Sequence, residues 1–423
     1  MRPLHLLAAT GLAAPLFVAG ALVFGPRPDE IATRRELIGR PGDYVGAESC
    51  RSCHPDHHAS WRATHHSRMT QRPGPQSVVG AFDGRVVRYE EQTARPFRDG
   101  ARYCIEVPTT DPGGAAHRTA EVALTVGSRR YQQYFERRQR GSSTEYVRLP
   151  ILWHVERQRW LHLNTVFLGP DNPDWHASAA VWNENCIFCH NVGPAPHASG
   201  AFGARDAAIA FDSKVADLGI ACEACHGPGG AHVRRFANPL ARYARQLGGE
   251  SDAAGGDSIC DPADLDRERS VSVCGQCHGA RLPSPFERID EWFSTGPTYR
   301  PGERLLEHVE PITPATPVHG DGDPELFRLR FWRDGTPRLT AYELQGVLAS
   351  QCYRDGEMTC LSCHAMHAGD PDGQLRPDRP GNALCLQCHT EIGRDVGAHT
   401  HHDPGGTGSN CVDCHMPRIV FGV

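Results

Sequence analysis

The chain has 423 residues, of which 39% are hydrophobic, 44 are glycine and 33 are proline. This composition is poor for two ordinary hydrophobic cores and typical of a loop-rich chain that wraps around large apolar groups. The formal net charge of −6 argues against a nucleic-acid partner, because nucleic-acid-binding surfaces are strongly basic.

Residues 1–26 are predicted to direct export. Arg2 precedes an apolar run over residues 4–24, which is the pattern of a signal peptide and is also long enough to span a bilayer. Two alternatives stay open: the segment is cleaved, or it remains as a membrane anchor. Either one places the rest of the chain on the periplasmic or extracellular side of the cytoplasmic membrane. Residues 27–45, with several arginines, prolines and glycines, are predicted to form a linker.

One short motif recurs along the rest of the chain: two cysteines separated by two residues, with a histidine directly after the second. It occurs seven times and uses fourteen of the 17 cysteines. In c-type haem attachment both thiols bond the porphyrin and the histidine ligates the iron, whereas zinc ribbons and disulfides need no histidine at that position. We therefore predict seven covalently attached haem c groups. Their thiols are Cys50, Cys53, Cys186, Cys189, Cys222, Cys225, Cys274, Cys277, Cys360, Cys363, Cys385, Cys388, Cys411 and Cys414. Their iron-ligating histidines are His54, His190, His226, His278, His364, His389 and His415.

The first haem segment, residues 46–77, contains a further pair of histidines. Trp61 is followed, three residues later, by a threonine and then by His65 and His66. This pattern resembles the exported multihaem c-type cytochrome family typified by the tetrahaem cytochrome of ammonia oxidisers. The resemblance implies that His66, rather than His65, is a distal haem ligand. The alternative is a pair of surface histidines on a short helix.

Residues 78–170 contain no haem motif, and their pattern is different. Short apolar–polar alternations, such as residues 85–89 and 121–126, are separated by glycine and proline. Alternation with a period of two predicts antiparallel strands. We expect a small antiparallel β insert in a fold that is otherwise mainly α-helical and irregular and that wraps around seven haems.

Residues 171–280 carry haems two to four. Directly after the third motif, glycines and a proline turn the chain tightly, and His232 follows. The sequence around this turn resembles multihaem proteins in which the last histidine caps a haem, which implies that His232 is a distal ligand. The alternative is a solvent-exposed histidine at the start of a helix.

The remaining segments are a haem-free stretch and a haem-rich one. Residues 281–349 are predicted to form loops and short strands, with His308 and His319 as further ligand candidates. Residues 350–423 carry haems five to seven and resemble exported multihaem cytochromes more specifically than any upstream segment, which implies distal ligands at His367, His399 and His402. Because His367 is only three residues from His364, we expect it to serve a neighbouring haem.

The supply of ligands decides the expected chemistry. Seven of the 24 histidines belong to motifs and one lies in the export segment, which leaves sixteen for distal positions, whereas there are only five methionines. Bis-histidine haems are closed on both faces and pass electrons. We therefore expect an electron carrier rather than an enzyme, with redox partner proteins such as a membrane quinol oxidase or another cytochrome.

Two alternatives to a carrier remain. One is an oxidoreductase that reduces or oxidises a small nitrogen or sulfur compound at one haem with an open face. The other is a structural subunit of a larger haem-bearing complex. Three cysteines, Cys104, Cys260 and Cys352, lie outside the motifs. In an exported protein two of them are candidates for a disulfide, and the sequence does not choose the pair.

Overall fold

The computed structural model describes residues 37–109, 116–166, 180–200, 209–247, 259–319 and 323–416. The predicted export segment and most of the linker lie outside these residues. The chain divides into two compact units, Met1–Gly39 and Arg40–Val423, and the helices and strands named below all lie in the second. No helix among the described residues is long and apolar enough to cross a membrane.

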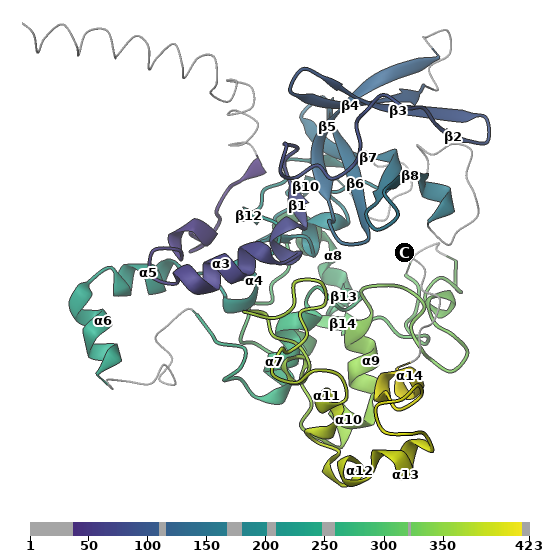
Figure 1. Cartoon of the computed structure of the whole chain (residues 1–423). Coiled ribbons are helices and arrows are strands. Elements are labelled where there is room, and N and C mark those ends of the chain that lie inside the picture. The colour runs from purple at the N-terminus through teal and green to yellow at the C-terminus, as the bar shows by residue number, and fades with distance from the viewer. Residues whose placement is uncertain are drawn as a thin grey trace, which may run out of the picture. The chain divides into compact units, whose positions relative to one another are not determined.

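The largest element is an eight-stranded antiparallel sheet, whose strands gather at one end of the second unit in Figure 1. Strands β2 to β8 follow one another in chain order, so each pairs with its sequence neighbours, and β1 pairs with β5. The strands are β1 (Thr70–Gln71), β2 (Val87–Tyr89), β3 (Gln92–Asp99), β4 (Arg102–Pro108), β5 (His117–Val126), β6 (Tyr131–Arg140), β7 (Ser143–His154) and β8 (Arg159–His162).

Alternating side chains explain why these residues form strands and where the core lies. On β5, Ala120, Val122 and Leu124 are buried while Glu121 is exposed, because successive side chains of a strand point to opposite faces. Burying one large apolar side chain stabilises the fold by about 1.5–3 kcal/mol. The buried core of the sheet consists of Phe82, Ala94, Tyr103, Ile105, Val107, Ala120, Val122, Tyr134, Leu149, Ile151 and Trp153.

The two edge strands of the sheet meet each other. The rings of Tyr89 on β2 and His162 on β8 stack with centroids 4.3 Å apart and planes 7° from parallel. The sheet is therefore nearly closed on itself. Closure of this kind protects the unpaired backbone groups of edge strands.

The expectation of a mainly α-helical fold with a small β insert is wrong. Strand β7 alone has 12 residues, whereas α3 and α7 have nine each and most other described helices are shorter. Each haem motif needs only one helical turn, so the motifs do not lengthen the helices. The alternating apolar residues instead form one continuous sheet that is nearly closed.

Short helices and strand pairs make up the rest of the described chain. The α-helices are α3 (Pro55–Ala63), α4 (Cys222–His226), α5 (Gly230–Phe236), α6 (Pro239–Gln246), α7 (Arg267–Gly275), α8 (Ile289–Thr295), α9 (Glu343–Ala349), α10 (Gln351–Arg354), α11 (Ala383–Leu386), α12 (Thr390–Arg394), α13 (Val396–Thr400) and α14 (Cys411–His415). The 3₁₀-helices are η1 (Ala47–Ser49), η2 (His66–Arg68), η3 (Leu163–Thr165), η4 (Cys186–Phe188), η6 (Phe286–Arg288), η7 (Leu305–Glu307), η8 (Arg328–Arg330) and η9 (Cys360–Ser362). Small antiparallel pairs are formed by β9 (Asn191–Val192) with β12 (Asp217–Leu218), β10 (Ala198–Ser199) with β11 (Ala210–Phe211), and β13 (Arg281–Pro283) with β14 (Val309–Pro311).

Local signals define several of these helices. Pro55 occupies the first turn of α3, where its missing N–H costs nothing. Asp266 caps α7 by accepting a 3.0 Å hydrogen bond from the Arg269 N–H. A small core that includes Val271 and Leu344 packs α7 against α9. These contacts hold α7, at whose end the fourth haem motif begins.

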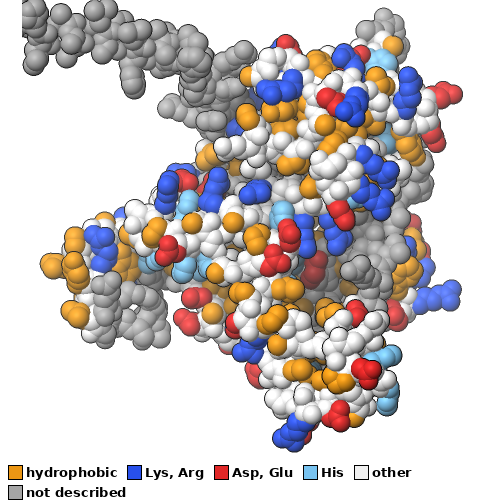
Figure 2. Space-filling view, viewed as in Figure 1, with side chains coloured by type: hydrophobic (Ala, Val, Ile, Leu, Met, Phe, Trp, Pro, Cys, Tyr) orange, Lys and Arg blue, Asp and Glu red, His pale blue; other side chains and the backbone are white. Residues whose placement is uncertain are grey.

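The large apolar side chains of helix α6 face solvent. Leu240 and Tyr243 on α6, and Leu247 directly after it, are 75%, 63% and 87% exposed. Figure 2 shows hydrophobic side chains gathered over this helix. Helix α6 follows α5, which carries His232.

Candidate haem-binding site

Each of the seven motifs forms a single helical turn. In the first, second, fourth, fifth and sixth motifs the histidine N–H donates to the carbonyl of the first cysteine over 2.9–3.1 Å. The third and seventh motifs are the helices α4 and α14 themselves. Residues three and four apart share one face of a helix, so this turn brings two thiols and one imidazole to the same side, as covalent haem attachment requires.

The thiols are available for this chemistry. All 17 cysteines lie in the described residues, and each is a free thiol. The disulfide considered for Cys104, Cys260 and Cys352 is not formed. Among the described residues, no group of three or more histidine, cysteine, aspartate or glutamate side chains is placed to hold a bare metal ion.

Three motif histidines are oriented by a hydrogen bond or a polar contact at Nδ1. His226 Nδ1 donates to the Cys260 carbonyl over 2.8 Å, and His364 Nδ1 donates to the Gly373 carbonyl over 3.1 Å. Since a carbonyl only accepts, the proton is on Nδ1, and Nε2 is left as the metal-binding nitrogen. His278 Nδ1 lies 3.5 Å from a carboxylate oxygen of Glu343, and this contact raises the pKa of His278. The donor set therefore fits haem c.

Four motif histidines have a second histidine ring opposite them. Two metal–nitrogen bonds of about 2 Å, plus about 1 Å from each nitrogen to its ring centre, put the rings of a bis-histidine iron site about 6 Å apart. The centroid separations to predicted distal ligands are 6.3 Å for His54 and His232, 6.3 Å for His226 and His367, 6.1 Å for His278 and His66, and 6.0 Å for His415 and His399. His57, three residues after His54, also lies 6.2 Å from the His54 ring.

Burial favours the ligand form of two of these histidines, His66 and His367. It lowers the pKa of His66 to about 4, with a further contribution from His278, and it also lowers the pKa of His367. His57, whose ring lies 4.4 Å from that of His367, lowers the pKa of His367 further. A neutral imidazole is the form that binds a metal, so these side chains are ready to coordinate at neutral pH.

The fifth predicted distal ligand, His402, is not brought opposite a motif histidine. His402 is exposed, and its backbone N–H donates to Thr400 Oγ1 over 3.3 Å. Within the described residues no second histidine ring stacks on His190, His364 or His389, although His278 lies near His190 and His66 lies near His364. Nδ1 of His190 is buried and has no hydrogen-bond partner there.

The remaining histidine candidates are engaged elsewhere. His65 contacts Ser128 Oγ over 2.9 Å, and His319 stacks on Phe286 with centroids 3.6 Å apart. His308 contacts Thr298 Oγ1 over 2.9 Å at Nδ1, and its Nε2 lies 3.2 Å from a carboxylate oxygen of Glu303. Both of its ring nitrogens are therefore occupied.

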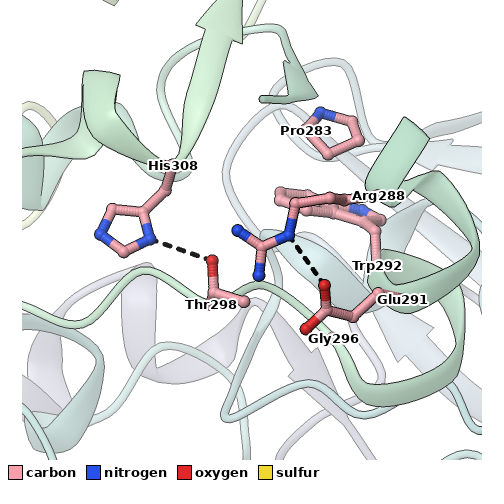
Figure 3. Close-up of a pocket in the computed structure, with 7 residues that line it drawn as sticks. All are labelled: Pro283, Arg288, Glu291, Trp292, Gly296, Thr298 and His308. Carbon is pink, nitrogen blue, oxygen red and sulfur yellow. Dashed lines mark hydrogen bonds and ion pairs between the residues drawn. The ribbon is translucent and has the colours of Figure 1, made fainter. Parts of the chain in front are cut away.

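His308 belongs to a small pocket behind the second motif. Figure 3 shows it on one side and Trp292, with the Arg288–Glu291 pair, on the other. Trp292 packs against Phe188 of the second motif with centroids 5.4 Å apart. The pocket has a volume of about 10 Å³, which is room for about one water molecule and too small for a haem.

Thiols of different motifs lie next to one another. Cys222 donates to Cys50 and thereby lowers the pKa of Cys50, and Cys274 likewise lowers the pKa of Cys360 to about 7. These contacts join the first motif to the third and the fourth to the fifth. The same kind of contact joins Cys277 to Cys189 and Cys411 to Cys385.

One site residue has no sequence signal. Glu223, inside the third motif, is 3% exposed and accepts hydrogen bonds from the N–H groups of Val45, Gly46 and Gly229 over 2.7–2.9 Å. Its carboxylate ties the chain before the first motif to the turn after the third. Motif recognition leaves the two residues between the cysteines unspecified, so it could not identify this role.

Comparisons with known proteins support haem attachment. A family model described as a doubled CXXCH motif matches residues 353–394, which hold the fifth and sixth motifs. The multihaem cytochrome MtrA of Shewanella baltica (strain OS185) is 25% identical over 212 residues, 49% of this chain and 53% of that protein. The chain thus spans about half the length of this relative. The crystal structure of the outer cell wall cytochrome OcwA is similar with a TM-score of 0.49 and 20% identity, over 83% of this chain and 68% of that one. The repeated motif, the family model and the MtrA relative support a multihaem c-type cytochrome with covalently bound haem c.

Proposed function

We propose that this multihaem c-type cytochrome is an exported heptahaem protein that transfers electrons in respiratory electron transport through mostly bis-histidine haems. The observation that carries the proposal is the set of four histidine pairs with rings 6.0–6.3 Å apart. Iron held on both faces has no position for a substrate and suits electron transfer. Haem c, when bound, supplies the one-electron redox centre.

The chain's own residues position and tune that centre. The paired thiols hold each group covalently, and the motif histidines supply the proximal ligands. His66, His232, His367 and His399 are the proposed distal ligands. The Nδ1 hydrogen bonds of His226 and His364 fix the ring orientation and increase the basicity of the coordinating nitrogen. The degree of burial differs between motifs, from Ile187 of the second motif, which is fully buried, to the exposed Cys388 and Cys414 of the sixth and seventh, and burial is one of the protein's means of adjusting a reduction potential.

The proposed location follows from the sequence and the chemistry. The apolar run over residues 4–24 directs export, and c-type haem is attached outside the cytoplasmic membrane. We place the protein on the periplasmic or extracellular side, with residues 4–24 as signal or anchor. Its partners are redox proteins, namely a membrane quinol oxidase or another cytochrome.

One observation favours the alternative of an oxidoreductase. His190, His364 and His389 have no facing histidine among the described residues, so a haem at one of these motifs is a candidate for an open axial position. Such a site would suit reduction or oxidation of a small nitrogen or sulfur compound.

Two measurements on the purified full chain test the proposal. The mass of the denatured chain should include seven haems, and six or fewer in fully matured protein would refute the heptahaem assignment. Electron paramagnetic resonance of the oxidised protein should be dominated by low-spin iron. Steady turnover of nitrite, hydroxylamine or tetrathionate with an artificial donor, abolished by cyanide at an open iron, would replace the carrier with the enzyme.

A further inference from the structure

We propose that Gln276 and Gln387 are positioning residues that hold the third and fourth motifs, and the fifth and sixth motifs, as two equivalent pairs. The family model covers the fifth and sixth motifs. The third and fourth would form a second doubled unit of the same construction. This inference rests on the proposed haem occupancy and adds how four of the attachment sites are fixed relative to one another.

The contact between the fifth and sixth motifs defines the arrangement. Gln387 is the third residue of the sixth motif. Its Nε2 donates over 2.9 Å to the carbonyl of Ser362, the third residue of the fifth motif. The same nitrogen donates over 2.6 Å to the carbonyl of Leu384, three residues earlier on α11. One amide group thus joins the two motif backbones directly.

The contact between the third and fourth motifs repeats this geometry. Gln276 is the third residue of the fourth motif, and its Nε2 donates over 2.8 Å to the carbonyl of Ala224, the third residue of the third motif. It also donates over 2.8 Å to the carbonyl of Val273, again three residues earlier. In both pairs the donor is the third residue of the later motif, the acceptor is the carbonyl of the third residue of the earlier motif, and the second acceptor is the carbonyl three residues before the glutamine.

The residue types fit this role. Among the seven motifs, glutamine occupies the third position only in the fourth and sixth. Ala224 and Ser362 are small, so a glutamine can reach the backbone behind them. A neutral amide supplies N–H donors and adds no charge beside the iron. Both glutamines are half-buried, where a satisfied hydrogen bond is stronger than in water.

The two pairs do not look alike in the sequence, because the segments that connect their motifs differ in length. The connecting segments are residues 227–273 in the first pair and only 365–384 in the second. A pattern with a fixed short spacing therefore finds the second pair and misses the first. The Cys274–Cys360 contact places the two pairs next to each other.

Substitution with methionine tests the proposal, because methionine keeps the length of glutamine but has no N–H donor. The variants are Gln276→Met, Gln387→Met and the double variant, and the control is Gln351→Met on α10, where the side chain is exposed. Circular dichroism in the Soret band detects coupling between closely paired haems. We expect the split Soret signal to decrease in each single variant and further in the double variant, and to be unchanged in the control. All four should retain the wild-type haem mass.

An unchanged Soret signal in the double variant would overturn the proposal. If the methionine variants lose haem, Gln276→Leu and Gln387→Leu supply a neutral side chain without the donor, and the same spectrum decides the outcome. The heptahaem assignment fails separately, through a wild-type mass with fewer than seven haems.

Discussion

His367 shows how a residue can serve a site far from its own segment. It follows the fifth motif by three residues, yet its ring lies 6.3 Å from that of His226 in the third motif. A ring so close in sequence to His364 cannot reach the far side of the same haem. The resemblance to exported multihaem cytochromes implied that His367 is a ligand, but only the tertiary contact assigns it to a particular motif.

Replacing His367 with alanine should open one iron. We expect the loss of the imidazole in His367→Ala to convert one haem from low spin to high spin, with all haems still attached. Electron paramagnetic resonance measures the change. The matched control is His402→Ala, since His402 is exposed and not opposite a motif histidine. Identical spectra for His367→Ala and the wild type would remove His367 from the ligand set.

Glu136 on β6 makes the sheet sensitive to acid. Its carboxylate accepts hydrogen bonds from Arg118 over 2.6 Å and from Arg138 over 2.7 Å. Burial alone would raise the pKa of Glu136, but the two guanidinium groups outweigh it and hold the pKa below its usual value. A lowered folded-state pKa stabilises the fold above the unfolded pKa of about 4.3, and this stability is lost as the pH falls through the folded value.

The variant Glu136→Gln should therefore destabilise the protein at pH 7 by about 1–3 kcal/mol. The difference from wild type should shrink below about pH 4, because the wild-type carboxyl becomes protonated. Denaturant unfolding at several pH values measures it. Glu391→Gln, at an exposed ion pair with Arg394, is the control and should show little difference at any pH. A Glu136→Gln difference that is constant from pH 7 to pH 3 would contradict this assignment.

At the scale of elements, the β-sheet is the main apolar core. Ile105 on β4 is fully buried and pairs in register with Ala120 on β5. The variant Ile105→Ala should cost about 2–5 kcal/mol of unfolding free energy, while Val86→Ala, at a residue 51% exposed, should change it by less than about 0.5 kcal/mol. Denaturant unfolding followed by tryptophan fluorescence measures both. Equal stability of the two variants would show that the sheet core does not carry the fold.

The sequence revealed the strands better than the fold they build. The alternating run at residues 121–126 lies in β5 and the run at 85–89 contains β2, but β6 is rich in arginine and glutamine and β3 contains Pro96. Neither has a clear period of two. Because β3 and β6 were not recognised as strands, the sequence predicted only a small β insert. Its near-closure depends on the contact between Tyr89 and His162, which no local pattern predicts.

At the scale of the whole molecule, the seven motifs form a connected set. Thiol contacts join the first motif to the third, the second to the fourth, the fourth to the fifth and the sixth to the seventh, and the two glutamines join the third to the fourth and the fifth to the sixth. The motifs themselves could be read from the sequence because their spacing is fixed by haem chemistry. Their order in space could not, because segments distant in the chain meet only after folding.

Controlled-potential coulometry tests the central claim most directly, because it counts the electrons that each chain accepts. A heptahaem carrier should take up seven electrons per chain, spread over a broad range of low potentials, and return all seven on reoxidation. Fewer than seven electrons from fully matured protein, or uptake that is not reversed on reoxidation, would contradict the account.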